Sequence, residues 1–147
     1  GSFMARPLQR KLRNIMWENC GVVRDNERLE LGLKEIDKLS ECLSDLDVRP
    51  DSEGYEDLVL AFDLEGSIVS AKATMLSAHS RKESRGAHQR SDYEKLDCEY
   101  DLNFITKLNE KNKMEVFERP LSQISAELDK LISETKIDDN IEGKLLE

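Results

Sequence analysis

Few side chains in this sequence could carry catalytic chemistry, and they lie far apart along the chain. The histidines are His79 and His88, and the cysteines are Cys20, Cys42 and Cys98. A nucleophilic thiol needs a base within hydrogen-bond reach, so Cys20 or Cys98 could pair with His88, but no flanking motif supports such a pair. Three cysteines without short metal-ligand spacing argue against zinc and against a disulfide scaffold, and they fit a reducing cytosol.

Cofactor chemistry also lacks a local motif. The chain has seven glycines, and no two are placed to form the glycine-rich loop that holds the phosphates of a nucleotide. The abundant carboxylates form no recognisable acid–base pair and are most simply explained as solvated helix faces. We therefore predict no catalytic, cofactor-binding or metal-binding residues within this chain.

The densest group of polar side chains is the segment 81–93, which reads RKESRGAHQRSDY. Guanidinium groups bind carboxylates and carbonyl oxygens as planar forks, so this segment is a candidate interdomain or partner interface. The candidate interface residues are Arg81, Arg85, His88, Arg90, Asp92 and Tyr93. Because an unpaired arginine is costly to bury, we expect the side chains of Arg85, His88 and Arg90 to be largely solvent-exposed or only locally paired in the isolated domain. The neighbouring arginines should keep His88 neutral near pH 7. The plain alternative is a charged helix end.

Composition restricts the classes of partner. The 147 residues carry a net charge of −9, whereas a nucleic-acid-binding domain usually presents a basic face. Positive charge is concentrated at the start of the chain and in segment 81–93, which fits either a specific acidic partner surface or a solvated face. No apolar stretch approaches the ~20 residues of a membrane span, so we expect a cytoplasmic protein without direct membrane insertion.

Three segments with helical periodicity must position segment 81–93. The first covers residues 7–21, with proline in its first turn and glycine at its end. The second covers residues 25–46, with Asp25 or Asn26 as its cap, and the third covers residues 53–84. Short links between them predict a mainly α fold, a three-helix up-and-down antiparallel bundle similar to a spectrin repeat.

The apolar positions of these helices predict the core of the bundle. We expect it to contain Leu12, Met16, Leu33, Ile36, Leu43, Leu58, Phe62, Val69 and Leu76. Trp17 lies one position off the apolar stripe and is expected to be partly buried at the helix edge. Gly66 costs ~1 kcal/mol relative to alanine inside a helix, so we expect it to allow a close neighbour.

The sequence changes in character after segment 81–93. Apolar residues alternate along 104–108 and again along 114–116, on either side of turn-like residues 109–113, which predicts a β-hairpin that Pro120 ends. A short amphipathic helix is predicted around residues 124–132. We therefore divide the chain into residues 1–93, the bundle with its basic segment; 94–135, an irregular segment, hairpin and short helix packed on the bundle; and 136–147, a flexible acidic tail.

Two segments resemble a known family. Residues 81–93 resemble the stretch RKESRGAHxRxDY/F of succinate dehydrogenase and fumarate reductase flavoproteins. Residues 12–25, LRNIMWENCGVVRD, are similar to LRxxMWExVGxVRD of the same family, in matching order and spacing. Cys20 replaces the usual valine, Glu94 replaces the proline that usually follows the aromatic residue, and Cys98 stands in what is often an acidic pair.

The resemblance implies a three-helix domain that follows FAD-binding and capping domains in a longer protein. That parent would interconvert succinate and fumarate, with hydride passing between substrate and FAD, and its substrate and flavin sites would lie upstream. This chain alone would bind no cofactor and catalyse nothing. Its implied partners are the upstream FAD-binding and capping domains and an iron–sulfur subunit, which could hold it at the inner face of a membrane.

Two alternatives to this family assignment stay open. L-Aspartate oxidase shares the architecture, but its counterpart stretch resembles RGLHxTxDYP, with leucine and threonine where this chain has Ala87 and Arg90. An independent helical adaptor that binds an amphipathic or acidic helix would also fit the leucine pattern. The residues Gly1-Ser2-Phe3 are typical of a vector-derived start, which fits a piece cut from a longer protein.

Overall fold

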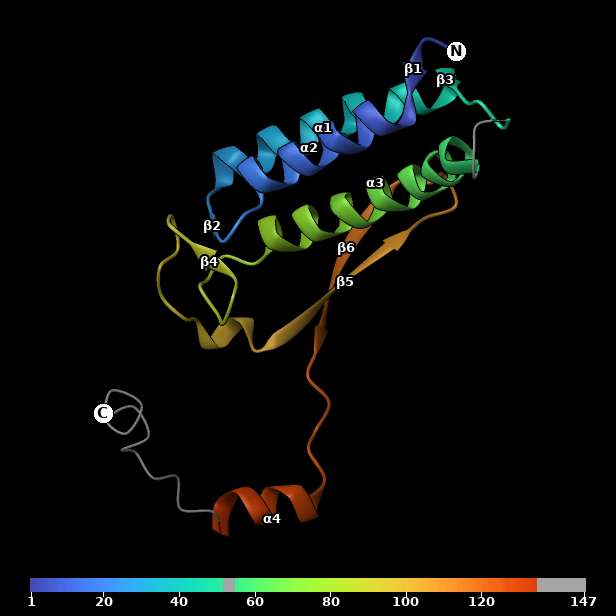
Figure 1. The fold of residues 1–147 in the computed structure, drawn as a ribbon. Coiled ribbons are helices and arrows are strands. Elements are labelled where there is room, and N and C mark those ends of the chain that lie inside the picture. The colour runs from blue at the N-terminus through green and yellow to red at the C-terminus, as the bar shows by residue number, and fades with distance from the viewer. Residues whose placement is uncertain (52–54, 135–147) are drawn as a thin grey trace, which may run out of the picture.

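Three antiparallel helices form the body of the molecule (Figure 1). The structure is a computed structural model that describes residues 1–51 and 55–134. Helices α1 (Ala5–Asn19), α2 (Asn26–Glu41) and α3 (Glu56–Ser80) run up, down and up along the bundle. The predicted three-helix up-and-down bundle is therefore confirmed.

The ends of α2 follow local chemistry. The carboxylate of Asp25 accepts a hydrogen bond from the backbone N–H of Arg28 at 2.8 Å, so Asp25 caps the helix as predicted. At its other end α2 continues as a 3₁₀ turn over Cys42–Asp45, and the regular helix is therefore shorter than the predicted segment 25–46. This tighter turn directs the chain into the link toward α3.

The end of α3 differs from the prediction. The helix stops at Ser80 instead of Ser84, because Arg81 already has an extended backbone (φ −81°, ψ 106°). Gly86, the predicted stop, lies beyond the helix in a turn where its φ is +56°. The guanidinium of Arg90 binds carbonyl groups of the last helical turn, which would otherwise lack partners at the helix end. The predicted start at Glu53 lies outside the described residues.

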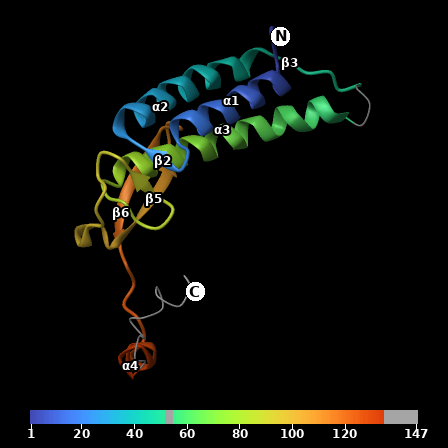
Figure 2. The same cartoon turned by 60° about the vertical axis from the view of Figure 1, so that its left-hand side comes forward.

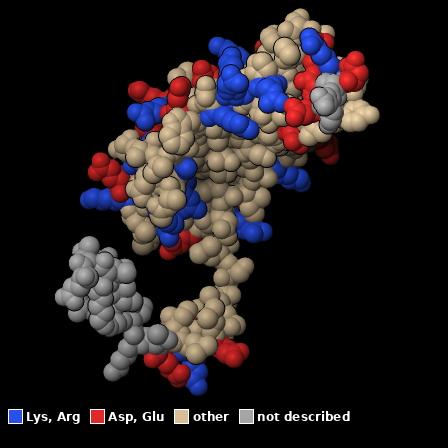
Figure 3. Space-filling view, in the orientation of Figure 1, with Lys and Arg blue, Asp and Glu red and all other residues tan. Residues whose placement is uncertain are grey.

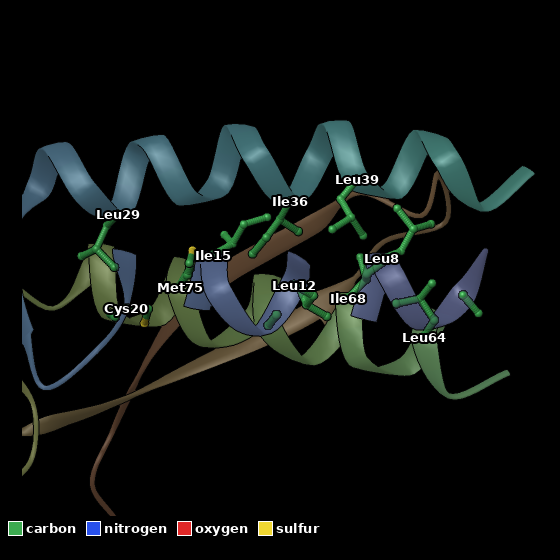
Figure 4. Close-up of a cluster of buried hydrophobic side chains, with 13 residues drawn as sticks. Leu8, Leu12, Ile15, Cys20, Leu29, Ile36, Leu39, Leu64, Ile68 and Met75 are labelled. Atoms are coloured by element: carbon green, nitrogen blue, oxygen red, sulfur yellow. The ribbon is translucent and has the colours of Figure 1, made fainter. Parts of the chain in front are cut away.

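The core lies where the three helices face one another (Figure 4). Its buried apolar residues are Ala5, Leu8, Leu12, Ile15, Cys20, Leu29, Ile36, Leu39, Leu64, Ile68, Ala71, Met75 and Ala78. Met16, Leu33 and Leu43 pack against this cluster and are partly buried, as the sequence predicted. A Cβ on Gly32 would lie 2.6 Å from Cε of Met75, so this glycine permits the close approach of α2 and α3.

Two predicted core residues and Trp17 face solvent instead. Phe62 is 74% exposed and Val69 is 38% exposed. Helix α3 is apolar on more than one side, so its sequence allowed two stripes, and the bundle buries the one that contains Leu64 and Ile68. Trp17 is 79% exposed, because it lies about 200° around α1 from Ile15, which faces the core. The predicted partial burial of Trp17 was wrong.

Two short parallel strand pairs hold the ends of the bundle together (Figure 1). At one end β1 (Phe3–Met4) pairs with β3 (Leu46–Asp47). At the other end β2 (Val23–Arg24), between α1 and α2, pairs with β4 (Gln89–Arg90), which follows α3. Strands of two residues are too short to show an alternating pattern, so the sequence did not indicate them.

The predicted hairpin is confirmed. Strands β5 (Leu102–Leu108) and β6 (Met114–Pro120) pair antiparallel, and Pro120 ends the second strand. The side chain of Asn109 shapes the turn, because its Oδ1 accepts from the backbone N–H groups of Lys111 and Lys113 at 2.9 and 3.0 Å. The hairpin lies against α3 (Figure 2).

The short helix α4 (Ala126–Glu134) stands apart from the bundle (Figures 1 and 2). Its apolar side chains Leu128, Leu131 and Ile132 are 46%, 56% and 52% exposed. The helix itself was predicted, but in the structure it does not pack on the bundle as expected. The predicted flexible tail, residues 136–147, lies outside the described residues.

Candidate functional site

Segment 81–93 closes one end of the bundle by binding the link between α1 and α2. The β2–β4 pair places Arg24 opposite Arg90, and the backbone N–H of Ser91 donates to the carbonyl of Arg24 at 2.9 Å. A carboxylate oxygen of Asp92 accepts from the backbone N–H of Asn26, in the first turn of α2, at 2.9 Å. The segments 12–25 and 81–93, far apart in sequence, are therefore in direct contact.

Arg90 is the centre of this closure. Its side chain is buried, with the residue 1% exposed. Its Nε and Nη2 bind the two carboxylate oxygens of Asp92 in a fork, both at 2.7 Å. Its Nη1 donates to the carbonyls of Ala78, His79 and Arg81 at 2.9, 3.3 and 3.3 Å, and its guanidinium lies 5.0 Å from the ring centre of Tyr93. Arg90 thus satisfies the open end of α3.

Glu83 is a second buried charged residue, and it joins two arginines. Its Oε1 accepts from Arg81 and, at 2.8 Å, from Arg85, while its Oε2 accepts from the backbone N–H of Asp97 at 3.0 Å. Burial raises the pKa of Glu83, but the hydrogen bonds from Arg85, Asp97 and Arg81 outweigh burial and lower it to about 2. The carboxylate therefore stays charged and holds the irregular segment after residue 93 against the bundle.

Arg81 connects this network to the hairpin. Its guanidinium donates to the carbonyls of Tyr100 and Leu102 at 2.9 and 2.7 Å and lies 4.9 Å from the ring centre of Phe104. Arg85 reaches in the same direction, with Nη2 2.7 Å from a carboxylate oxygen of Asp101. The first residues of the hairpin are thereby fixed to the end of α3.

His88 is held between two arginines. Its Nδ1 lies 2.8 Å from Nη1 of Arg24, and its Nε2 lies 3.2 Å from the carbonyl oxygen of Arg81. A guanidinium only donates, so Nδ1 must accept and the ring is the neutral tautomer that carries its hydrogen on Nε2. Burial, together with the nearby charges of Arg24 and Arg90, lowers the pKa of His88, which agrees with the prediction that it is neutral.

Among the six candidate residues, the structure corrects the expected exposure of Arg90. Arg90 is internal, not solvent-exposed, because the carbonyls at the end of α3 and the carboxylate of Asp92 replace its hydration. Arg81, Arg85 and His88 are partly buried, whereas Asp92 and Tyr93 remain exposed. Sequence reasoning missed Arg24 and Glu83. Their signal was present in the two motifs, since Arg24 lies in the first and Glu83 in the second.

A separate surface feature is a groove between α1 and α3 with a volume of about 860 Å³. The α1–α3 groove is lined by Leu12, Met16 and Trp17 on one side and Phe62, Gly66 and Ala71 on the other. The face of the molecule seen in Figure 3 is largely uncharged across its middle. A Cβ on Gly66 would meet nothing within 4 Å, so the close neighbour expected at Gly66 is not in the described part of the chain.

A metal centre and a Cys–His pair are the other sites to consider in residues 1–51 and 55–134. They contain no group of three or more His, Cys, Asp or Glu side chains that could hold a metal ion. Burial raises the pKa of the Cys20 thiol, and both ring nitrogens of His88 are bonded elsewhere, so no Cys–His pair forms among these residues. Within the same ranges, no helix is long and apolar enough to cross a membrane.

Known proteins with similar sequences include flavoprotein subunits. The chain is 34% identical over 122 residues to the mitochondrial succinate dehydrogenase [ubiquinone] flavoprotein subunit of Oryza sativa subsp. japonica, covering 82% of this chain and 19% of that protein. It is 32% identical over 96 residues to the fumarate reductase flavoprotein subunit of Haemophilus influenzae, covering 65% of this chain and 16% of that one. The chain thus spans less than a fifth of the length of these relatives.

Solved structures show the same fold. A variant of E. coli quinol fumarate reductase FrdA matches 86% of this chain and 22% of its own, with a TM-score of 0.77 at 22% identity. Adenylylsulfate reductase from Archaeoglobus fulgidus matches 82% of this chain and 20% of its own, with a TM-score of 0.74 at 24% identity. Residues 9–132 match the family model described as fumarate reductase flavoprotein C-term. The chain therefore belongs to the family of fumarate reductase flavoprotein C-terminal domains.

Proposed function

We propose that this chain is the C-terminal accessory domain of an FAD-dependent succinate dehydrogenase or fumarate reductase flavoprotein. The parent protein interconverts succinate and fumarate at an FAD bound by its upstream domains, and this chain contributes stability and contact surface but no catalytic residue. Family membership and the names of the relatives support this assignment.

The observation that carries the proposal is the α1–α3 groove. Trp17 and Phe62 are 79% and 74% exposed on its walls, although large aromatic side chains supply much of the apolar area that folding and association bury. An apolar groove of this kind marks an interaction surface. The chain spans less than a fifth of its relatives' length, so the FAD-binding and capping domains are the occupants that we propose.

Segment 81–93 is proposed as a second contact, with the upstream domains or an iron–sulfur subunit. Tyr93 is 39% exposed and the Arg85 side chain is 36% exposed, so both can reach a partner. Arg90 and Asp92 contribute indirectly, because their ion pair fixes the backbone shape of the segment. Association with an iron–sulfur subunit would place the protein at the cytoplasmic face of a membrane.

The two alternatives are less well supported. The relatives reported above are succinate dehydrogenase and fumarate reductase flavoproteins, and Arg90 makes five hydrogen bonds that a threonine, the residue in the L-aspartate oxidase stretch, could not make. An independent adaptor would not require a match to a flavoprotein domain over residues 9–132.

The test is expression of the complete gene that encodes this chain, followed by measurement of bound FAD and of succinate-dependent dye reduction. The product should be a flavoprotein that reduces the dye. Replacement of Trp17→Ser together with Phe62→Ser should lower its FAD content. Leu31→Ser is the matched control, because Leu31 is 53% exposed on α2 and outside the groove. A product without flavin, or equal FAD loss in the control, would contradict the proposal.

The isolated 147-residue chain should be colourless, because it has no glycine-rich loop to hold the phosphates of FAD. Absorbance near the flavin bands after purification measures this directly. A stoichiometric yellow cofactor in the isolated chain would show that the division of roles is wrong.

A further inference from the structure

A hollow of about 540 Å³ lies between the end of α3, the link before α2 and the first strand of the hairpin. Segments 12–25 and 81–93 both contribute to it, the first through Arg24 and the second through Arg81 and His88. The opposite wall carries Asn103, Phe104 and Thr106 of β5, and α3 adds Thr74 and Ser77. No acidic side chain is among the described residues that line this polar hollow.

The charges around the polar hollow do not balance. Arg90 is neutralised by Asp92, and the charges of Arg81 and Arg85 are met by Glu83 and Asp101. Arg24 forms no ion pair with a carboxylate anywhere in the described part of the chain; its Nε donates to the carbonyl of Gly21 at 2.8 Å and its Nη1 to His88. One positive charge, partly buried, is therefore left over.

Because His88 is neutral, it adds nothing to the uncompensated charge of Arg24. His88 accepts from Arg24 and so orients that guanidinium without adding charge of its own. Two other arginines lie near the ring. The carbonyl of Arg81 accepts from Nε2 and its guanidinium pairs with Glu83, while Arg90 pairs with Asp92. The hollow thus has a positioned guanidinium and a net charge of one.

Hydrogen-bonding groups without partners complete the site. Besides the hydrogen bonds from Nε and Nη1 of Arg24, none is formed within residues 1–51 and 55–134 by its Nη2, by the Ser77 hydroxyl or by the Thr106 hydroxyl. The residues that carry these groups come from three different elements and line the same hollow. Polar groups arranged in this way can hold an anion between a charged donor and neutral ones.

We propose that the polar hollow binds a carboxylate, with Arg24 as the charged donor and Ser77 and Thr106 as neutral hydrogen-bonding groups. The single uncompensated positive charge matches the single charge of one carboxylate better than the double charge of a phosphate. The carboxylate has two possible sources, a small free carboxylate or an aspartate or glutamate side chain of another part of the assembly. The proposal stands without the function proposed above.

The experiment is titration of the 15N-labelled 147-residue chain, followed by NMR at low ionic strength, because salt weakens ion pairing. Succinate and acetate probe a free carboxylate, and N-acetyl-aspartate methylamide, whose backbone ends carry no charge, probes a side-chain carboxylate. Saturable shifts are expected at Arg24, His88 and Thr106 with at least one of these probes.

Variants decide whether the shifts come from the proposed site. Arg24→Gln should weaken binding about tenfold or more, since it removes a charged hydrogen bond. Thr106→Val keeps the shape of the strand residue and should weaken binding several-fold even if Arg24→Gln disturbs the link. Arg28→Gln, at an arginine already paired with Asp25 and outside the hollow, should bind as the parent does.

Each outcome is informative. Saturation by succinate or acetate, lost in Arg24→Gln and Thr106→Val, assigns the hollow to a free carboxylate. Saturation by the aspartate derivative alone assigns it to a side chain of a partner surface. Absence of saturable shifts with every probe, or shifts that both variants leave unchanged, overturns the proposal.

Discussion

Replacement of Arg90 by alanine tests whether the end of α3 depends on one guanidinium. The change removes a two-point contact with Asp92 and three hydrogen bonds to helix-terminal carbonyls. These groups face the protein interior, where Arg90 is 1% exposed, so water cannot simply take the place of the side chain.

The expected loss of stability depends on which groups Arg90→Ala leaves without a hydrogen-bond partner. Removing one partner of a buried ion pair costs ~3–5 kcal/mol. The Asp92 side chain is 29% exposed and keeps its bond from Asn26, so part of its charge is hydrated again. We therefore expect Arg90→Ala to lower the free energy of unfolding by about 3 kcal/mol, a large part of the ~5–15 kcal/mol of a typical domain.

The assay is urea unfolding followed by far-UV circular dichroism, with the slope compared between variants to confirm two-state behaviour. Arg90→Lys should lie between parent and Arg90→Ala, because lysine keeps the charge but not the planar fork. Arg10→Ala is the control, an exposed arginine on α1, and should change stability by less than ~0.5 kcal/mol. A loss under ~1 kcal/mol for Arg90→Ala would refute the structural role given to this residue.

Three further predictions concern other parts of the fold. Ile36→Ala should cost ~2–5 kcal/mol in the same assay, because Ile36 is 0% exposed, whereas Leu31→Ala on the outer face of α2 should cost far less. The pKa of Glu83 is about 2 in the folded state, below its ordinary value of 4.5. The stability that this carboxylate contributes is therefore full above about pH 4.5 and is lost as the pH falls toward 2. Glu83→Gln should flatten this part of the plot of unfolding free energy against pH. Gly66→Ala should stabilise the isolated chain by ~0.5–1 kcal/mol in thermal unfolding, because a Cβ at this position meets nothing within 4 Å. In the complete protein the same change should lower FAD retention if a neighbouring domain packs on Gly66. Destabilisation of the isolated chain by Gly66→Ala would count against this account.

The helices and the hairpin could be predicted because their signals are local. The cap at Asp25, the alternation in β5 and β6, and the turn at Asn109 each depend on residues near one another in sequence. The amphipathic patterns of α1 and α2 each indicated a single buried face, and Leu12 and Ile36 are buried as expected. The two motifs carried the family resemblance without any knowledge of their contacts.

Which face of α3 is buried could not be read from its sequence. This helix is apolar on two sides, and both Leu64 and Phe62 belong to plausible stripes. The choice depends on α1 and α2, which cover one side, while the hairpin lies against another. Phe62 is left on the α1–α3 groove as a result.

The charged segment shows the same division between local and tertiary information. The sequence by itself determined that arginines gather after a long helix and that acids are few beside them. Only the tertiary structure decided that Arg90 turns inward to the end of α3 and that Arg24, some sixty positions earlier, meets His88 at 2.8 Å. The physical reason is that a buried charge is tolerated only where hydrogen-bond partners converge on it, and such convergence is a property of the folded chain rather than of residue spacing.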